Sequence, residues 1–245
     1  MPSLSAADPF HSPCYRKGAV RAVLLASLCA SLTAETASAQ TNTDEQLWLN
    51  ATALGTIAGD ALFHAELQPR IGNDAGGLDQ FIARGAVGYR ASPMVSIYQG
   101  YAYVESPRDN LPRLKEDRSF QQLSLGPVQV GRGELSGRTR LEERWRSDGD
   151  DMGLRLRHQV RYEHPLTRSD RSIAALGWVE GFVNLKDTDW GNRSGFDQLR
   201  SFAGLEFSVT GASTVEAGYM NQFVDVPSGG NTVRHVASIT LLYRP

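Results

Sequence analysis

Hydrophobic and polar positions alternate along this chain with a period of two. In LSGRTRLEERWR, residues 135–146, every second position is mostly apolar, with Leu135, Leu141 and Trp145 among them. The intervening positions are Ser136, Arg138, Arg140, Glu142, Arg144 and Arg146. Because alternate side chains of a strand point to opposite faces of a sheet, this pattern predicts a strand with one apolar and one charged face. Glu143 is an exception on the apolar face.

The same alternation recurs along the chain and predicts an all-β protein. Residues 153–163 repeat it, with Leu154 and Leu156 on one face and Arg155 and Arg157 on the other. Turn-forming residues such as Pro227-Ser228-Gly229-Gly230 separate the segments. The predicted strands are 47–57, 61–70, 79–90, 94–105, 117–125, 134–146, 153–163, 173–185, 196–209, 213–223 and 232–243. No amphipathic helix of useful length is predicted.

A membrane barrel explains this pattern better than a soluble sandwich. A sandwich packs its apolar faces against each other, whereas a membrane barrel turns them outward to lipid and keeps its polar face inside. A closed barrel also satisfies every backbone hydrogen bond, as lipid demands. Aromatic residues near strand ends fit the same arrangement: Trp48, Phe81, Tyr89, Trp145, Tyr162, Phe223 and Tyr243. We therefore predict a transmembrane up-and-down antiparallel β-barrel of about 10–12 strands with a polar interior.

The connections between the predicted strands alternate in length. Those after the first, third and ninth strands are short. Those after the second, fourth, eighth and tenth are longer and charged, for example residues 106–117 and 186–195. Outer-membrane barrels have short periplasmic turns and long outer loops. With a periplasmic C-terminus, eleven strands would leave the N-terminus outside, so we expect ten or twelve.

The first 39 residues have the layout of a secretory signal peptide. Arg16, Lys17 and Arg21 precede an apolar run over 22–34, and the small residues Ala37-Ser38-Ala39 follow. The run is shorter than the about 20 residues of a transmembrane helix. We expect cleavage after Ala39, which leaves 40–245 as a single outer-membrane barrel domain without cysteine and so without disulfides. The leading region is longer than usual, which leaves the start site open.

Several short motifs, in their order, resemble a known family. KEDRSFQQ carries Glu116, Arg118, Gln121 and Gln122, and RTRLEER carries Arg138, Arg140, Glu142 and Arg144. Arg155 and Arg157 follow in the next strand, then FAGLEF from Phe202 and GYMNQF with Tyr219 and Gln222. The ordered set resembles the bacterial family named domain of unknown function 2490 over nearly all of residues 40–245. The resemblance implies an outer-membrane β-barrel and no particular activity. The chain ends on Tyr243-Arg244-Pro245, whereas many barrels finish on an aromatic residue.

The charged faces supply the residues that we expect to line the interior. These are Arg138, Arg140, Glu142, Arg144, Arg155, Arg157, Arg161, Glu180, Arg200, Glu206 and Glu216. Our working hypothesis is a water-filled, narrow channel in which a basic wall faces an acidic one and excess arginine favours small anionic solutes. One alternative is a non-conducting structural barrel with an interlocked Arg/Glu core. Another is a soluble periplasmic barrel that binds an anionic ligand.

The sequence predicts neither catalysis nor a cofactor. The histidines after residue 39 lie outside any compact Ser/His motif, and no G-x-S-x-G occurs: His64, His158, His164 and His235. The acidic loops that begin at Asp148 and Asp187 lack the twelfth-position glutamate of a calcium loop, so no metal site is expected. The formal net charge is −2 and no region is broadly basic, which argues against nucleic acid. We expect a monomer that meets outer-membrane lipid, lipopolysaccharide, the barrel-assembly machinery and small anionic solutes.

Overall fold

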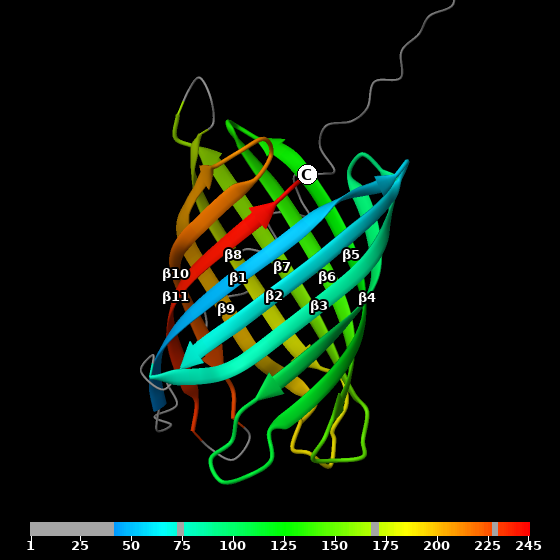
Figure 1. The fold of residues 1–245 in the computed structure, drawn as a ribbon, viewed down its shortest axis with the longest axis vertical. Helices are drawn as coiled ribbons and strands as arrows, with labels where there is room; N and C mark the ends of the chain where they lie inside the picture. The colour runs from blue at the N-terminus through cyan, green and yellow to red at the C-terminus, as the bar shows by residue number, and fades with distance from the viewer. Residues whose placement is uncertain (1–41, 73–75, 168–171, 227–229) are drawn as a thin grey trace, which may run out of the picture. The chain divides into compact units, whose positions relative to one another are not determined.

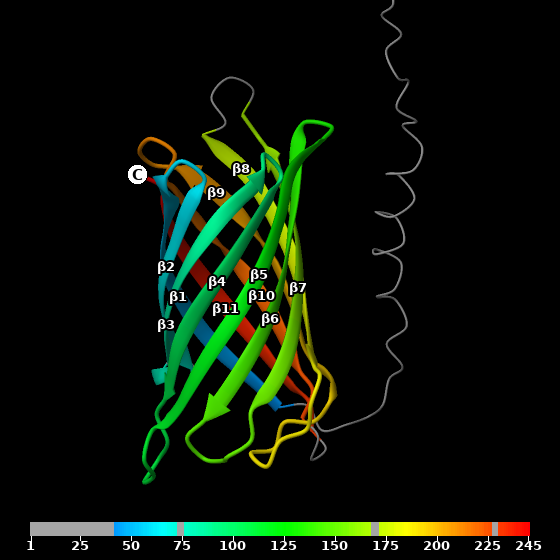
Figure 2. The ribbon, with the colours of Figure 1, turned by 90° about the vertical axis from the view of Figure 1, so that its right-hand side faces the viewer.

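The computed structural model describes residues 42–72, 76–167, 172–226 and 230–245. The described residues form a closed β-barrel of eleven strands (Figures 1 and 2). The strands are β1 (Asn42–Ala58), β2 (Ala61–Gly72), β3 (Gly77–Ser92), β4 (Val95–Ser106), β5 (Leu114–Val130), β6 (Gly133–Arg146), β7 (Gly153–Pro165), β8 (Ile173–Asn184), β9 (Gly195–Ser208), β10 (Thr214–Val224) and β11 (Thr232–Tyr243). No helix in these ranges is long and apolar enough to cross a membrane.

All eleven predicted segments are strands, but the expectation of ten or twelve is wrong. Each strand pairs antiparallel with the next along the chain. The barrel closes where β1 and β11 pair in parallel, from Asn42↔Thr232 to Ala53↔Tyr243. The expectation assumed that the first and last strands run in opposite directions. Because β1 and β11 pair in parallel, they run in the same direction, and the barrel can close with an odd number of strands.

The connections differ between the two ends of the barrel. The loops β4–β5, β6–β7 and β8–β9 lie at the lower end in Figure 1, here called the loop end. The other end, here called the turn end, holds the tight connections β1–β2, β3–β4 and β5–β6 and the end of β11. The long loop expected after the second strand is shorter than predicted, because β2 continues to Gly72 and β3 begins at Gly77.

The two faces of the barrel wall have opposite chemistry. On the inner face, Arg140 is 2 % exposed and Glu142 is 1 % exposed. On the outer face, large apolar side chains stay exposed in nearly every strand, as Val87 at 63 % and Ile239 at 45 % illustrate. Trp48, expected on the apolar face, instead lies inside at 3 % exposure and contacts arginine. The charged interior that the alternation predicts is confirmed.

Apolar side chains fill part of the interior. Trp48, Leu176, Phe202, Met220 and Val236 form a buried cluster, and Trp178 stacks on Phe202 with ring centroids 5.4 Å apart. Inward glycines make room for such rings. A Cβ at Gly204 would lie 2.6 Å from the Phe202 ring, and one at Gly100 would overlap Phe120. The charged groups therefore occupy a packed lumen in which side chains leave limited space.

Candidate anion-binding site

A buried layer of ion pairs crosses the middle of the barrel. Arg155 donates to Glu142 from Nε and Nη2, at 3.0 and 2.6 Å, and Arg157 donates to Glu142 from Nη1 at 2.7 Å. Nη2 of Arg157 also contacts both oxygens of Glu180 at 3.0 Å, and Arg138 reaches Glu180 at 3.1 Å. Several charge-assisted hydrogen bonds to each carboxylate are what buried charges need.

Further arginines extend this layer around the wall. Arg118 donates to Glu116 at 2.9 and 3.0 Å, and Arg144 donates to the same carboxylate. Arg140 donates from Nε to the side-chain carbonyl of Gln122 at 2.9 Å and lies 4.3 Å from the centre of the Phe120 ring. These contacts join β5 and β6 on the inside of the barrel.

A separate acidic cluster lies nearer the turn end. Arg161 donates to Glu216 at 2.8 Å, to Glu206 at 2.9 Å and to Glu163 at 3.1 Å. One guanidinium group thus serves three carboxylates. The charge balance of the interior therefore changes along the barrel axis, with acidic groups in excess here.

The structure brings the predicted interior residues together in three places. Arg138, Arg140, Glu142, Arg144, Arg155, Arg157 and Glu180 join the central layer and its extension, Arg161, Glu206 and Glu216 form the acidic cluster, and Arg200 lies at the loop end. The predicted basic wall facing an acidic wall is not seen, because acids interleave with the arginines. Sequence reasoning did not include Arg70, Arg118 and Arg234 in the predicted set, although alternation places them on inner faces.

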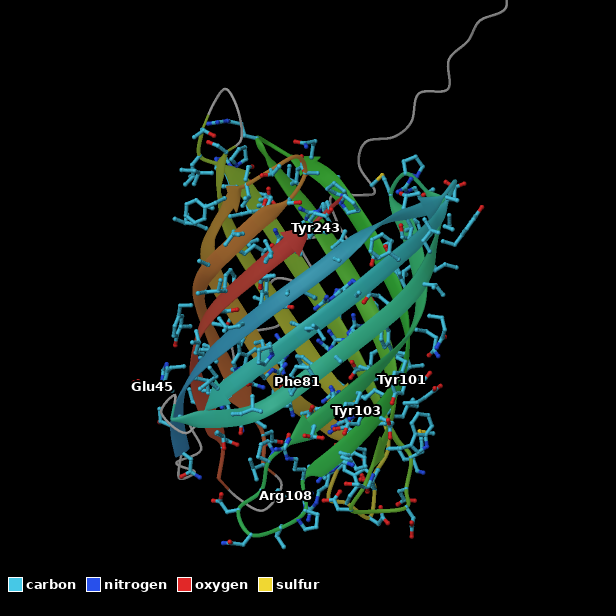
Figure 3. The ribbon with its side chains drawn as sticks, viewed as in Figure 1. Glu45, Phe81, Tyr101, Tyr103, Arg108 and Tyr243 are labelled. Carbon is cyan, nitrogen blue, oxygen red and sulfur yellow. The ribbon has the colours of Figure 1, made fainter. Side chains whose placement is uncertain are left out.

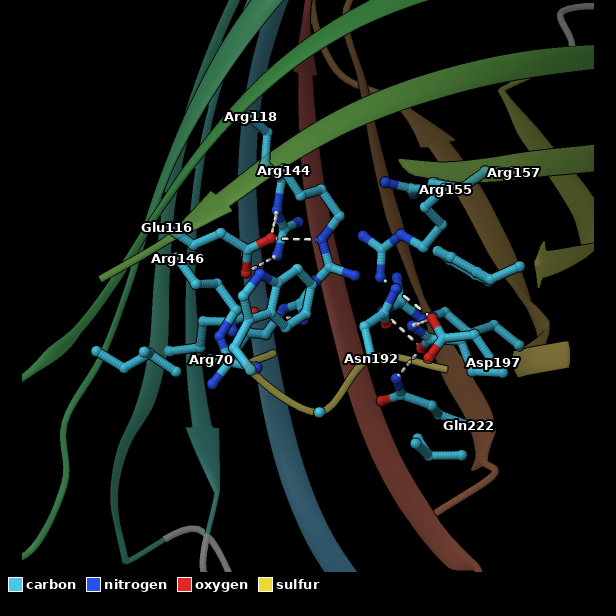
Figure 4. A pocket seen from close by; sticks show the side chains of 18 of the residues that line it. Arg70, Glu116, Arg118, Arg144, Arg146, Arg155, Arg157, Asn192, Asp197 and Gln222 are labelled. Atoms are coloured by element: carbon cyan, nitrogen blue, oxygen red, sulfur yellow. Dashed lines mark hydrogen bonds and ion pairs between the residues drawn. The ribbon is translucent and has the colours of Figure 1, made fainter. Parts of the chain in front are cut away.

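A basic cavity of 290 Å³ opens between this layer and the loop end (Figure 4). Among the residues that line it, Glu116 and Asp197 are the carboxylates. The arginines that line it are Arg70, Arg84, Arg118, Arg144, Arg146, Arg155, Arg157, Arg200 and Arg234. Most of these arginines also pair with carboxylates outside the lining, such as Glu66, Glu142 and Glu180, so the lining itself is basic but the net excess of positive charge is smaller than nine against two. We call this cavity, with its lining residues, the basic vestibule.

Aromatic rings allow the arginines of the basic vestibule to pack closely. The guanidinium carbon of Arg70 lies 3.6 Å from the centre of the Trp48 ring, and that of Arg200 lies 5.0 Å away. Phe182 contacts both Arg157 and Arg200, each at 4.6 Å. The negative face of a ring attracts a cation, so these rings partly offset the repulsion between neighbouring arginines.

Several buried nitrogens in the basic vestibule have no protein acceptor. Within the described residues, Nε of Arg84, Arg157, Arg200 and Arg234 is buried without a hydrogen-bond partner. Arg200 donates to the amide oxygen of Gln198 at 3.1 Å, and no carboxylate of the described chain forms an ion pair with it. A buried, unsatisfied charged donor is costly. These donors are suited to carboxylate, phosphate or sulfate oxygens.

Trp190, in the β8–β9 loop, covers the basic vestibule. Its ring centre lies 4.8 Å from the Arg146 guanidinium and 5.2 Å from that of Arg144. Its Nε1 donates to the carbonyl of Asp151 at 2.8 Å, which links the loop to β6–β7. Periodicity does not extend into loops, so the alternation could not have identified this residue.

Asp189, next to Trp190, connects the β8–β9 loop to the β6–β7 loop. Its carboxylate accepts from the backbone N–H of Asp150 at 2.8 Å and of Asp151 at 3.2 Å. The Asp150 N–H is the main reason that the pKa of the Asp189 carboxyl lies below its usual value. In the described parts of the chain, no three His, Cys, Asp or Glu side chains gather as metal ligands. These acids therefore act as hydrogen-bond acceptors for the loops.

The fold and this interior define a class of protein: a closed β-barrel with a charged, largely filled lumen and a basic vestibule at one end. The chain belongs to the family described as protein of unknown function (DUF2490), whose model matches residues 45–234. It is 47 % identical over 224 residues to an uncharacterised protein of Methylorubrum extorquens, covering 91 % of this chain and 97 % of that protein. No solved structure matches the chain.

Proposed function

We propose that this protein is a non-conducting outer-membrane β-barrel whose basic vestibule binds a small, multiply charged anion. The observation that carries the proposal is the cluster of nine arginines and two carboxylates around one cavity at the loop end. Four buried Nε donors on these arginines have no acceptor in the described chain. An anion with several oxygens would accept from the guanidinium groups that line the cavity and would offset their positive charge.

The outer surface supports the membrane location. Leu67 is 52 % exposed, Ile97 50 % and Leu241 45 %, on strands distributed around the barrel. An apolar belt of this extent exceeds the patches that water-soluble monomers tolerate, and lipid would cover it. Aromatic side chains lie toward both ends, with Tyr243 near the turn end and Phe81 and Tyr103 toward the loop end (Figure 3). Two such aromatic girdles are typical of outer-membrane barrels.

The central layer favours a closed lumen over the anion channel. Glu142 and Glu180 are 1 and 2 % exposed, and each is held by two arginines. Phe120 and Phe182, each 1 % exposed, lie under neighbouring guanidinium groups. Permeation would require these ion pairs to separate. In this proposal, an anion enters from the loop end and stops at the layer.

Anion titration of the purified, folded barrel tests the binding site. Inorganic phosphate, sulfate and citrate are the probes, and tryptophan fluorescence and calorimetry are the readouts. Arg200→Gln should weaken binding of the best probe about tenfold or more, because it removes one charge-assisted contact worth about 1.5–3 kcal/mol. This variant leaves no carboxylate of the described chain without its ion-pair partner, so the barrel should fold.

Arg90→Gln is the matched control. Arg90 is exposed near the turn end and is not among the vestibule residues. It removes the same charge by the same substitution and should leave affinity unchanged. Equal weakening by both variants would mean that net charge alone attracts anions. Failure of every probe to bind would refute the vestibule function.

Two further measurements test location and closure. The protein should fractionate with outer membranes and need detergent for extraction, whereas release without detergent would support the soluble alternative. Folded protein in a planar bilayer should remain silent under a salt gradient. Discrete openings with an anion-selective reversal potential would restore the channel hypothesis.

A further inference from the structure

The outer wall carries a polar strip in the middle of strands β4 and β5. Gln121 Nε2 donates to Oε1 of Gln99 at 3.1 Å, and Gln99 Nε2 donates to the Ser119 hydroxyl at 3.2 Å. The Tyr101 hydroxyl donates to Asp117 next to them. These side chains alternate with inward residues such as Phe120, so they face outward. We call these five residues the polar strip.

The polar strip is local and lies away from the barrel rims. Gln121 is near the centre of β5, which spans Leu114–Val130, and it pairs with Gln99 inside β4. The matching outward positions of β1–β3 are apolar, including Ala51, Leu67 and Val87. The strip therefore interrupts the apolar outer face at the depth where the proposed location places acyl chains, and the exposed Thr139–His158 pair lies beside it on β6 and β7.

Lipid cannot satisfy this group of side chains. An amide side chain has two N–H donors and an oxygen with two acceptor positions, and the contacts between Gln99, Gln121 and Ser119 use only part of that capacity. In the hydrocarbon layer an unmet hydrogen bond is costly, which is why polar side chains there are found between protein surfaces. A second protein surface is the environment that suits the strip.

We propose that the polar strip is the contact surface of a two-fold symmetric dimer of this protein, in place of the monomer expected from the sequence. Amides both donate and accept, so Gln99 and Gln121 can pair with the same residues of a second copy. A two-fold axis along the membrane normal, between β4 and β5, keeps those residues at equal depth. It also separates Glu143, on β6, from its counterpart, whereas Asp117, on β5, lies nearer the axis and accepts from the Tyr101 hydroxyl.

Two features beside the polar strip favour a second copy over a lipid. A groove of 640 Å³ adjoins Gln99 and Gln121, with Val87, Ile97 and Leu123 among its residues, and offers space for apolar side chains of the partner. On the loop-end side, Asp117 and Glu143 present carboxylates that repel the phosphate groups of a lipid headgroup. The proposal rests on the membrane location proposed above.

Cysteine cross-linking in intact outer membranes tests the dimer. Cys14 and Cys29 both fall in the expected signal peptide, and serine at both makes a new thiol the sole one. Gln121→Cys lies close to the proposed axis and should give a disulfide-linked dimer under mild oxidation. Val179→Cys, which is 48 % exposed on β8, is the matched control and should give several-fold less.

A second variant tests whether the amide side chains of Gln99 and Gln121 stabilise the dimer or merely lie near its interface. Gln99→Leu with Gln121→Leu should convert the detergent-extracted dimer to a monomer in light scattering, because it replaces the amides with groups that lipid accepts. Equal cross-linking at 121 and 179, or none at 121 in membrane-embedded, folded protein, overturns the dimer and leaves the membrane location intact. Recovery of the protein in the soluble fraction would instead refute the membrane location.

Discussion

For single residues, burial determines which charged side chains contribute to the stability of the barrel. Glu142 and Glu143 are adjacent on β6, yet Glu142 is 1 % exposed and holds Arg155 and Arg157, whereas Glu143 faces outward. Arg140 and Arg157 lie directly opposite each other on β6 and β7. Like charges in that position destabilise a sheet. The Glu142 carboxylate, close to both, is what makes the arrangement tolerable.

Replacing Glu142 should therefore destabilise the barrel strongly. Glu142→Gln leaves buried guanidinium groups without their counter-charge, and we expect the free energy of unfolding to fall by about 3–5 kcal/mol. Urea unfolding in detergent, followed by tryptophan fluorescence, measures this change. Glu143→Gln makes the same substitution on the opposite face and should change stability by less than about 0.5 kcal/mol. Similar losses in both variants would contradict the buried ion-pair layer.

At the scale of elements, the β6–β7 and β8–β9 loops behave as one unit. Asp189 accepts from backbone groups of β6–β7, and Asp151 Oδ2 accepts in return from the Asp189 N–H at 2.9 Å. Gly153, at the start of β7, lies against Trp190, where an added Cβ would be 2.5 Å from the ring. The loops thus hold Trp190 over the basic vestibule through backbone contacts.

This unit should open at low pH. The Asp150 N–H holds the pKa of Asp189 below its usual value, so the ionised carboxylate stabilises the loops above that usual pKa. The stabilisation is lost as the pH falls through the lowered pKa of the folded protein. Acidification from pH 6 to well below the usual pKa of an aspartate should therefore expose Trp190 and shift its emission to longer wavelength.

Two variants connect this shift to Asp189. Asp189→Asn should show the shifted emission already at pH 6, whereas Asp109→Asn, in the neighbouring β4–β5 loop, should not. Trp190→Phe should lack the change. An unchanged emission of Asp189→Asn would show that the carboxylate does not hold the loops together.

For the whole molecule, the sequence predicts which segments form strands and which face of each strand is polar. It does not predict which side chains contact each other across strands. The period of two identifies all eleven strands because the inner and outer faces differ so sharply in chemistry. The pairing of Arg155 with Glu142, or of Arg161 with three glutamates, depends on strand register and side-chain reach. Trp48 is expected outside because its side chain is apolar, yet it shares the inner face with Gln46 and Thr52 and packs against Arg70. Alternation has no information on such contacts.

The seam between β1 and β11 is the least predictable feature, and disulfide trapping tests its direction. In the parallel register Ala51 faces Leu241, so a variant with cysteine at both positions should form an intramolecular disulfide and migrate faster without reductant. Cysteines in place of Leu49 and Tyr243 are the control, in the same background without Cys14 and Cys29. They are offset by four positions along the seam, roughly 13 Å, which is too far for a disulfide. An antiparallel seam through the same central pair would bring Leu49 opposite Tyr243. A disulfide in the control variant would therefore contradict the parallel closure and the odd number of strands that depends on it.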